Sequence, residues 1–139
     1  MLAVAVGPAQ VSGWPPLWSS GVRLEVFAGG LVLVGFVLLL AGARRLGANL
    51  TPLPYPIAAG VLVDRGIYAW VRHPIYGGLM LMAAGWAFRR GGGLTLLYAL
   101  LLVTVLALKS RREETWLLAR HAGYDTYRRR TRRFLPFVW

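Results

Sequence analysis

The chain has 139 residues, enough for one domain, and 57% of them are hydrophobic, while the formal net charge is +11 with only five acidic residues. Soluble domains carry more charged residues, and a nucleic-acid-binding protein would spread its basic groups over a soluble fold, so neither class fits. The lack of cysteine excludes disulfides and Cys-ligated metals, and the two histidines show no metal-ligand spacing. We expect a single membrane domain over residues 1–139, with no metal and no nucleic-acid partner.

The first predicted element is a membrane span over residues 22–43. Its length of roughly 33 Å, at about 1.5 Å per residue, crosses the hydrocarbon core. Trp14 and Trp18 flank a proline pair just before it, which is typical of an interfacial aromatic anchor. The apolar run ends at Arg44 and Arg45. The start of the chain has no basic segment of the kind that opens a cleaved signal peptide, so none is expected.

Residues 46–74 are predicted to form a loop. Pro52, Pro54 and Pro56 lack the amide hydrogen that a helix uses, and each restricts the residue before it. Because a loop of this length in so small a protein is usually functional, we expect it to take part in a site.

A helical hairpin is predicted over residues 75–108. Its first apolar run, residues 75–88, would reach about 21 Å, which is short for a full crossing, so the hairpin is either tilted or only partly crossing. A second run follows over residues 94–108. The basic, amphipathic residues 109–139 are expected to form a tail that continues as a helix at the membrane surface and then becomes a loop ending at residues 134–136. The predicted fold class is therefore all-α integral membrane, with about three embedded helices, a cytoplasmic loop and an amphipathic tail.

The distribution of basic residues predicts the orientation. Residues 44–72 and 109–139 together hold 13 (4 and 9) of the 16 Lys and Arg residues. Basic residues gather in cytoplasmic loops, so both segments are predicted to be cytoplasmic, with the C-terminus inside a bacterial inner (plasma) membrane.

Two polar clusters flank the hairpin. Arg72, His73 and Tyr76 stand at the start of its first helix, where Pro74 suits an early helix position, and a Glu pair at 113–114 follows the second helix. Taken singly, these residues fit an aromatic membrane belt with charged helix ends equally well. Taken together, they predict a site, because a hairpin brings its two ends close to each other.

Three motifs carry a resemblance to a known family. They are G-I-Y-A-W-V-R-H-P-I-Y-G-G at residues 66–78, E-E at 113–114, and Y-D-T-Y-R-R-R-T-R-R-F-L-P at 124–136. Over residues 49–137 the chain resembles the isoprenylcysteine carboxyl methyltransferase and phospholipid methyltransferase family of integral membrane enzymes. The resemblance implies a methyltransferase that uses S-adenosyl-L-methionine.

The resemblance also assigns residue roles. The positions that match the family's cofactor-binding residues are Gly60, Val61, Leu62, Val63, Tyr68, His73, Pro74, Ile75, Tyr76 and Glu113. Lys109 stands where related enzymes have a substrate-binding Arg, and Arg72 is expected to bind substrate beside it. We expect His73, Tyr76 and Glu114 to be catalytic, since an amine acceptor would need His73 or Glu114 to remove its proton.

The methyl acceptor is left open among several classes. The resemblance implies a lipophilic small-molecule or lipidated acceptor, either a prenylcysteine carboxylate or a lipid-like molecule, and membrane lipid as a further partner. The alternatives are an N-methyltransferase that acts on a phospholipid or amine, and a non-catalytic small membrane protein of the same fold. A basic protein that binds anionic lipid through residues 128–133 would explain the tail but not the loop.

Overall fold

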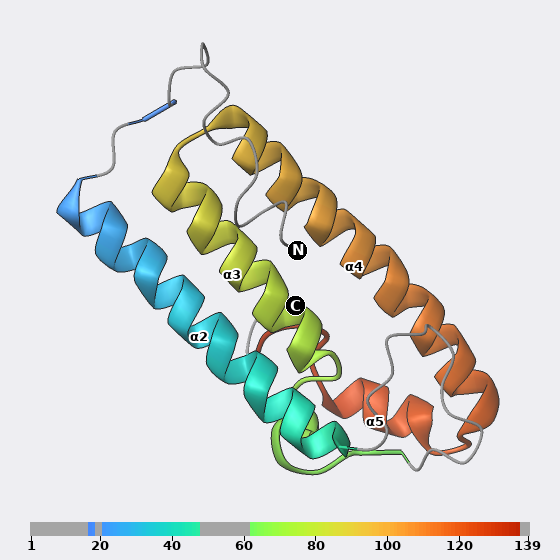
Figure 1. Ribbon diagram of the computed structural model, residues 1–139. Helices are drawn as coiled ribbons and strands as arrows, with labels where there is room; N and C mark the ends of the chain where they lie inside the picture. The colour runs from blue at the N-terminus through green and yellow to red at the C-terminus, as the bar shows by residue number, and fades with distance from the viewer. Residues whose placement is uncertain (1–16, 19–20, 48–61, 137–139) are drawn as a thin grey trace.

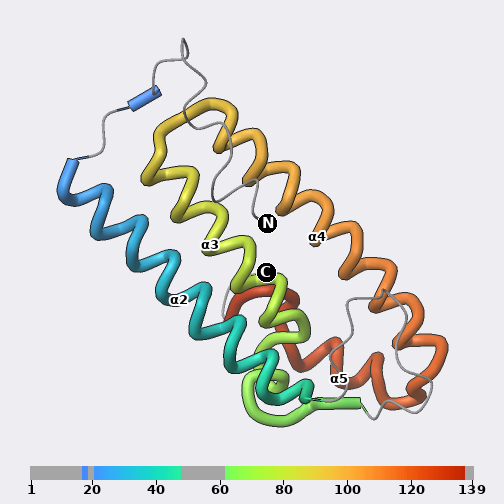
Figure 2. The backbone as a smooth tube through the Cα atoms, in the orientation of Figure 1, coloured from blue at the N-terminus to red at the C-terminus, as the bar shows by residue number. Residues whose placement is uncertain are grey.

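The computed structural model describes residues 17–18, 21–47 and 62–136. The helices of these segments are α2 (Val22–Leu46), the short 3-10 helix η2 (Gly66–Ala69), α3 (Pro74–Arg90), α4 (Gly93–Arg120) and α5 (Tyr124–Arg130). In the shared orientation of Figure 1 and Figure 2, α3 lies between α2 and α4, and α5 packs across the end where α3 begins. Within the described segments, β pairing is limited to one isolated parallel bridge between Val71 and Arg132.

Helices α2 and α3 pack backbone against backbone. A Cβ atom added at Gly35 would lie 2.5 Å from the carbonyl oxygen of Gly78, and one added at Gly85 would lie 2.6 Å from that of Ala28. Small residues at these positions let two helices approach closely, which is how helices associate when lipid removes the hydrophobic drive between them. The glycines of both helices therefore fix α3 against α2.

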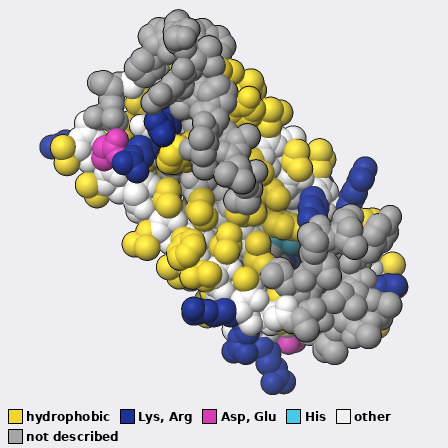
Figure 3. Space-filling view, viewed as in Figure 1, with side chains coloured by type: hydrophobic (Ala, Val, Ile, Leu, Met, Phe, Trp, Pro, Cys, Tyr) yellow, Lys and Arg dark blue, Asp and Glu magenta, His cyan; other side chains and the backbone are white. Residues whose placement is uncertain are grey.

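The outer faces of α2 and α4 are apolar and exposed. Both helices are long and apolar enough to cross a membrane, with mean hydropathies of 2.5 and 1.9, and only 22% of each apolar window is buried inside the protein. Figure 3 shows hydrophobic side chains across the middle of one face, with Lys and Arg gathered toward its ends. An exposed apolar surface of this extent suits contact with lipid. The prediction of an all-helical membrane fold is confirmed.

The first helix is longer than predicted, and the second helix of the hairpin continues into the basic tail, as predicted. The first helix runs to Leu46 and ends at Gly47, where φ is +49°. Helix α4 continues without a break from Gly93 to Arg120, twelve residues beyond the apolar run that ends at Leu108. Its charged extension is rich in Lys, Arg, Glu and Leu, which favour helix as strongly as apolar residues do. The second helix of the hairpin and the start of the tail are thus one helix.

Candidate active site

The start of α3 holds the first polar cluster. Pro74 occupies the first helical turn, and His73 lies at the N-cap position with an extended φ of −124°. Tyr76 follows one turn inside the helix, and its ring stacks parallel to the His73 imidazole, with centroids 5.4 Å apart and planes at 5°. The proline thus fixes the turn that stacks these two rings.

The far part of α4 brings the second cluster to the same place. The Tyr76 hydroxyl donates a hydrogen bond of 2.5 Å to Oε1 of Glu113. Nδ1 of His73 lies 3.6 Å from Oε2 of Glu113, and Nζ of Lys109 lies 4.0 Å from Oε1. Lys109 Nζ also lies 5.3 Å from the centre of the Tyr76 ring. The two clusters that flank the hairpin therefore meet, as the sequence predicts.

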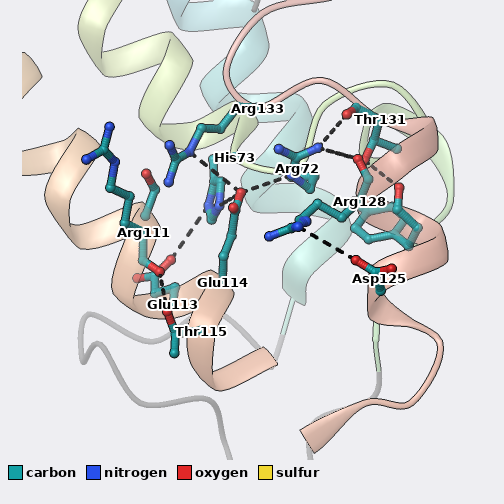
Figure 4. A network of polar contacts seen from close by, with 12 residues as sticks. Arg72, His73, Arg111, Glu113, Glu114, Thr115, Asp125, Arg128, Thr131 and Arg133 are labelled. Carbon is teal, nitrogen blue, oxygen red and sulfur yellow. Dashed lines mark hydrogen bonds and ion pairs between the residues drawn. The ribbon is translucent and has the colours of Figure 1, made fainter. Parts of the chain in front are cut away.

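Glu114 lies deeper than Glu113 and is surrounded by two arginines and a histidine (Figure 4). Its Oε1 is 2.9 Å from Nε of Arg72, 3.3 Å from Nε2 of His73 and 3.6 Å from Nε of Arg133. The Glu114 side chain is 10% exposed and that of Glu113 is 19% exposed. The neighbouring carboxylates thus have different surroundings: Glu113 faces Tyr76 and Lys109, and Glu114 is enclosed by three nitrogen groups.

A buried tyrosine pair supports the turn before α3. Tyr127 of α5 donates a 2.7 Å hydrogen bond to the carbonyl oxygen of Tyr68 in η2, and the Tyr68 hydroxyl lies 3.5 Å from the carbonyl oxygen of Gly42 in α2. Burial, with the negative charge of Glu113 adding to it, raises the pKa of Tyr68 to about 12. Both the burial of this phenol and its hydrogen bond tie η2 to the helices around it.

The other residues expected to bind the cofactor are placed less completely. Gly60 and Val61 lie outside the described residues, and Leu62 and Val63 are half-buried just before η2. Pro74 is fully buried, and Ile75 packs against α2. Their proposed contacts with a cofactor stay predictions.

Residues 131–134 also contribute to the site, although no site role was predicted for them. Phe134 is buried with its ring 6.1 Å from that of His73, and its carbonyl oxygen lies where any side chain at Gly77 would stand. Arg133 contacts Glu114, as described above. This segment pairs with residues about 60 positions earlier, and such a pairing leaves no periodic pattern in the sequence.

With this geometry in view, the comparisons with known proteins become informative. The family model described as phospholipid methyltransferase matches residues 24–123. The chain belongs to the phospholipid methyltransferase family. The match to this family includes both polar clusters and stops before residues 131–134.

Two relatives of this family member are much longer than the chain itself. A Protein-S-isoprenylcysteine O-methyltransferase of Schizosaccharomyces pombe is 34% identical over 80 residues, which are 56% of this chain and 34% of that protein. A solved structure of the eukaryotic intramembrane Ras methyltransferase ICMT (isoprenylcysteine carboxyl methyltransferase) matches with a TM-score of 0.72 and 26% identity. That match covers 84% of this chain and 43% of the other. The chain thus spans between a third and a half of these relatives.

Proposed function

We propose that this protein is an S-adenosyl-L-methionine-dependent membrane methyltransferase that acts on a lipophilic acceptor. The observation that carries the proposal is the meeting of Glu113, Tyr76, His73 and Lys109 at one end of two apolar, membrane-length helices. Family membership and the names of both relatives support the same reaction class. Because the chain is shorter than those relatives, its activity has to be tested on the chain itself.

The side chains present fit the cofactor chemically. S-adenosyl-L-methionine has an ammonium and a carboxylate at one end, and it supplies a methyl group that is already activated on a sulfonium sulfur. Glu113 offers a partly exposed carboxylate for the ammonium. The first turn of α3 offers amide groups that favour a carboxylate. The stacked rings of His73 and Tyr76 offer aromatic surface, which attracts cations such as a sulfonium.

The chain's own residues then have three tasks: to align donor and acceptor, to hold charges and to exclude water. Glu113 and Tyr76 hold the cofactor's amino end, and buried Phe134 shields His73 from solvent. Lys109 is the cation that we assign to the acceptor side. Arg72, expected from sequence to share that role, instead uses Nε and Nη1 within the protein, on Glu114 and on the carbonyl oxygen of Arg128.

Among acceptors, we favour a carboxylate such as that of a prenylcysteine. A carboxylate is ionised at pH 7 and needs no base, whereas an amine must first lose a proton. Glu114, one candidate base, already accepts charge-assisted bonds from Arg72 and His73. A phospholipid or amine acceptor, which the family's description suggests, is the second candidate.

We also propose that the end of the molecule carrying the site faces the cytoplasm of a bacterial inner membrane. The site lies at the end where α2 finishes with Arg44 and Arg45 and where α5 carries three consecutive arginines. Basic residues on one side of a span favour the cytoplasmic side. In that orientation a soluble cofactor arrives from the cytoplasm and an apolar acceptor from the bilayer.

Calorimetric titration tests the proposal directly. Detergent-purified protein, checked to be monodisperse, is titrated with S-adenosylhomocysteine, and saturable binding is expected. The protein is then incubated with methyl-labelled S-adenosyl-L-methionine and either a prenylcysteine or a phospholipid extract. Label in the organic phase that mild base releases as methanol indicates an ester, and base-stable label indicates N-methylation. Absence of binding by intact protein contradicts the proposal.

A further inference from the structure

Residues 131–134, here called the closing segment, lie across the start of α3. The amide of Arg72 donates to the carbonyl oxygen of Arg132 at 2.8 Å, and the amide of His73 donates to that of Arg133 at 2.9 Å. In return, the amide of Arg132 donates to Trp70 at 2.9 Å. The segment that immediately precedes α3 is thus bonded strand-like to the last described residues of the chain, beyond the part that the family model matches.

The Arg72 guanidinium joins three parts of the chain (Figure 4). Its Nε donates to Glu114 on α4, while its Nη1 donates to the carbonyl oxygen of Arg128 at 2.8 Å and to both oxygens of Thr131. A planar guanidinium with donors in a fixed fork can serve several acceptors at once, and a lysine ammonium cannot hold the same geometry. Arg72 thereby ties α4 and the end of α5 to the start of α3.

Arg133 closes the same cluster from the other side. Its Nε approaches Oε1 of Glu114 at 3.6 Å, its guanidinium lies 5.4 Å from the centre of the Phe134 ring, and its side chain is 14% exposed. Glu114 therefore has one half-buried arginine before α3 and another on the closing segment. His73 lies between them, with Nε2 on Glu114 and its ring between those of Tyr76 and Phe134.

We propose that Glu114, Arg72 and Arg133 are positioning residues that hold the closing segment over His73 and so shape the cofactor site. Glu114 then acts through its two arginines and not as a proton acceptor, since buried carboxylates with such partners stay ionised and engaged. The inference rests on the proposed function for the identity of the ligand. The hydrogen-bonded closure itself does not depend on it.

Arg133 and Arg132 supply a matched pair of variants. Both lie on the closing segment, but the Arg132 side chain is exposed, whereas that of Arg133 contacts Glu114. We expect Arg133→Gln to weaken S-adenosylhomocysteine binding about tenfold or more, with the melting temperature and helical content close to those of the parent. Arg132→Gln keeps its backbone bonds and should change the affinity less than twofold. Arg133→Lys keeps the charge and should recover part of the affinity.

Amide hydrogen exchange, read without any ligand, tests the closure separately. Arg133→Gln should speed exchange at Arg72, His73 and Arg132 together, because the amides of these three residues donate across the closure. Arg132→Gln should leave the exchange of these amides unchanged. If Arg133→Gln unfolds, S-adenosylhomocysteine affinity and hydrogen exchange are measured instead on Arg133→Lys and Arg72→Lys, which retain the charge.

The outcomes separate the two proposals. If the parent protein binds no S-adenosylhomocysteine, the proposed function fails, and hydrogen exchange alone decides the closure. If Arg133→Gln speeds exchange but leaves the affinity unchanged, the closure has only a structural role and the positioning inference is overturned. If Arg133→Gln changes neither the exchange rates nor the affinity, the contact between Arg133 and Glu114 does not hold the closing segment, and the inference is overturned. A double-variant cycle with Glu114→Gln should show that the two losses of affinity are less than additive.

Discussion

Replacing Glu113 with Gln isolates the charge that we assign to the cofactor's amino group. Gln has nearly the same volume, and its side-chain oxygen can still accept the 2.5 Å hydrogen bond from Tyr76. The negative charge is lost, and with it a charge-assisted bond that contributes about 1.5–3 kcal/mol. At 1.36 kcal/mol per tenfold change, we expect S-adenosylhomocysteine affinity to fall roughly 10- to 150-fold. Since the side chain is 19% exposed, water weakens the interaction only partly.

Isothermal titration in detergent measures this loss, with circular dichroism to check that the helices are intact. Asp125 on α5, whose side chain is 44% exposed and paired with Arg128 and Arg129, offers a control for removal of one acidic charge. Asp125→Asn should leave affinity unchanged. Equal affinity for Glu113→Gln and the parent removes Glu113 from the cofactor site and refutes the charge assignment.

Three further outcomes are expected. Tyr76→Phe deletes the hydroxyl that bonds the Glu113 carboxylate and should weaken S-adenosylhomocysteine binding roughly tenfold with helicity preserved, as titration and circular dichroism can check. Gly78→Val places a Cβ atom 2.9 Å from the amide nitrogen of Leu39, so thermal unfolding in detergent should show a loss of about 1–3 kcal/mol, whereas Gly29→Ala, in open space, should cost nothing. Alkaline phosphatase fused to the C-terminus should be inactive, and an active fusion would reverse the proposed orientation.

Hydropathy and hairpin geometry account for what the sequence predicts correctly. The apolar runs identify α2 and the two helices of the hairpin, and the short turn at Gly91, where φ is +64°, forces their far ends together. The contact between Tyr76 and Glu113 follows from that turn together with the continuation of α4 past Leu108. Residues that neighbour each other through a local fold can thus be paired from the sequence.

The closing segment could not be predicted in the same way. The parallel bridge between Val71 and Arg132 joins residues far apart in the chain, and a single bridge produces no alternating pattern. By contrast, the continuation of α4 past Leu108 follows from the sequence, because Lys, Arg and Glu extend a helix readily. Glu114 contacts Arg133 of the closing segment, so its surroundings differ from those of Glu113 for a reason that only the three-dimensional arrangement supplies.

The short length of α3 affects how far an acceptor must move out of the bilayer to reach the site. Its 17 residues span about 25 Å, against about 37 Å for the 25 residues of α2. Pro74 and Ile75 pack beside Gly42, so α2 continues about 6 Å, one helical turn, past the start of α3. A helix shorter than the hydrocarbon core is accommodated by local thinning of the bilayer. We therefore expect the water boundary to dip between α2 and α4, so that the lipophilic acceptor proposed above would present its head to His73 without being lifted out of its leaflet.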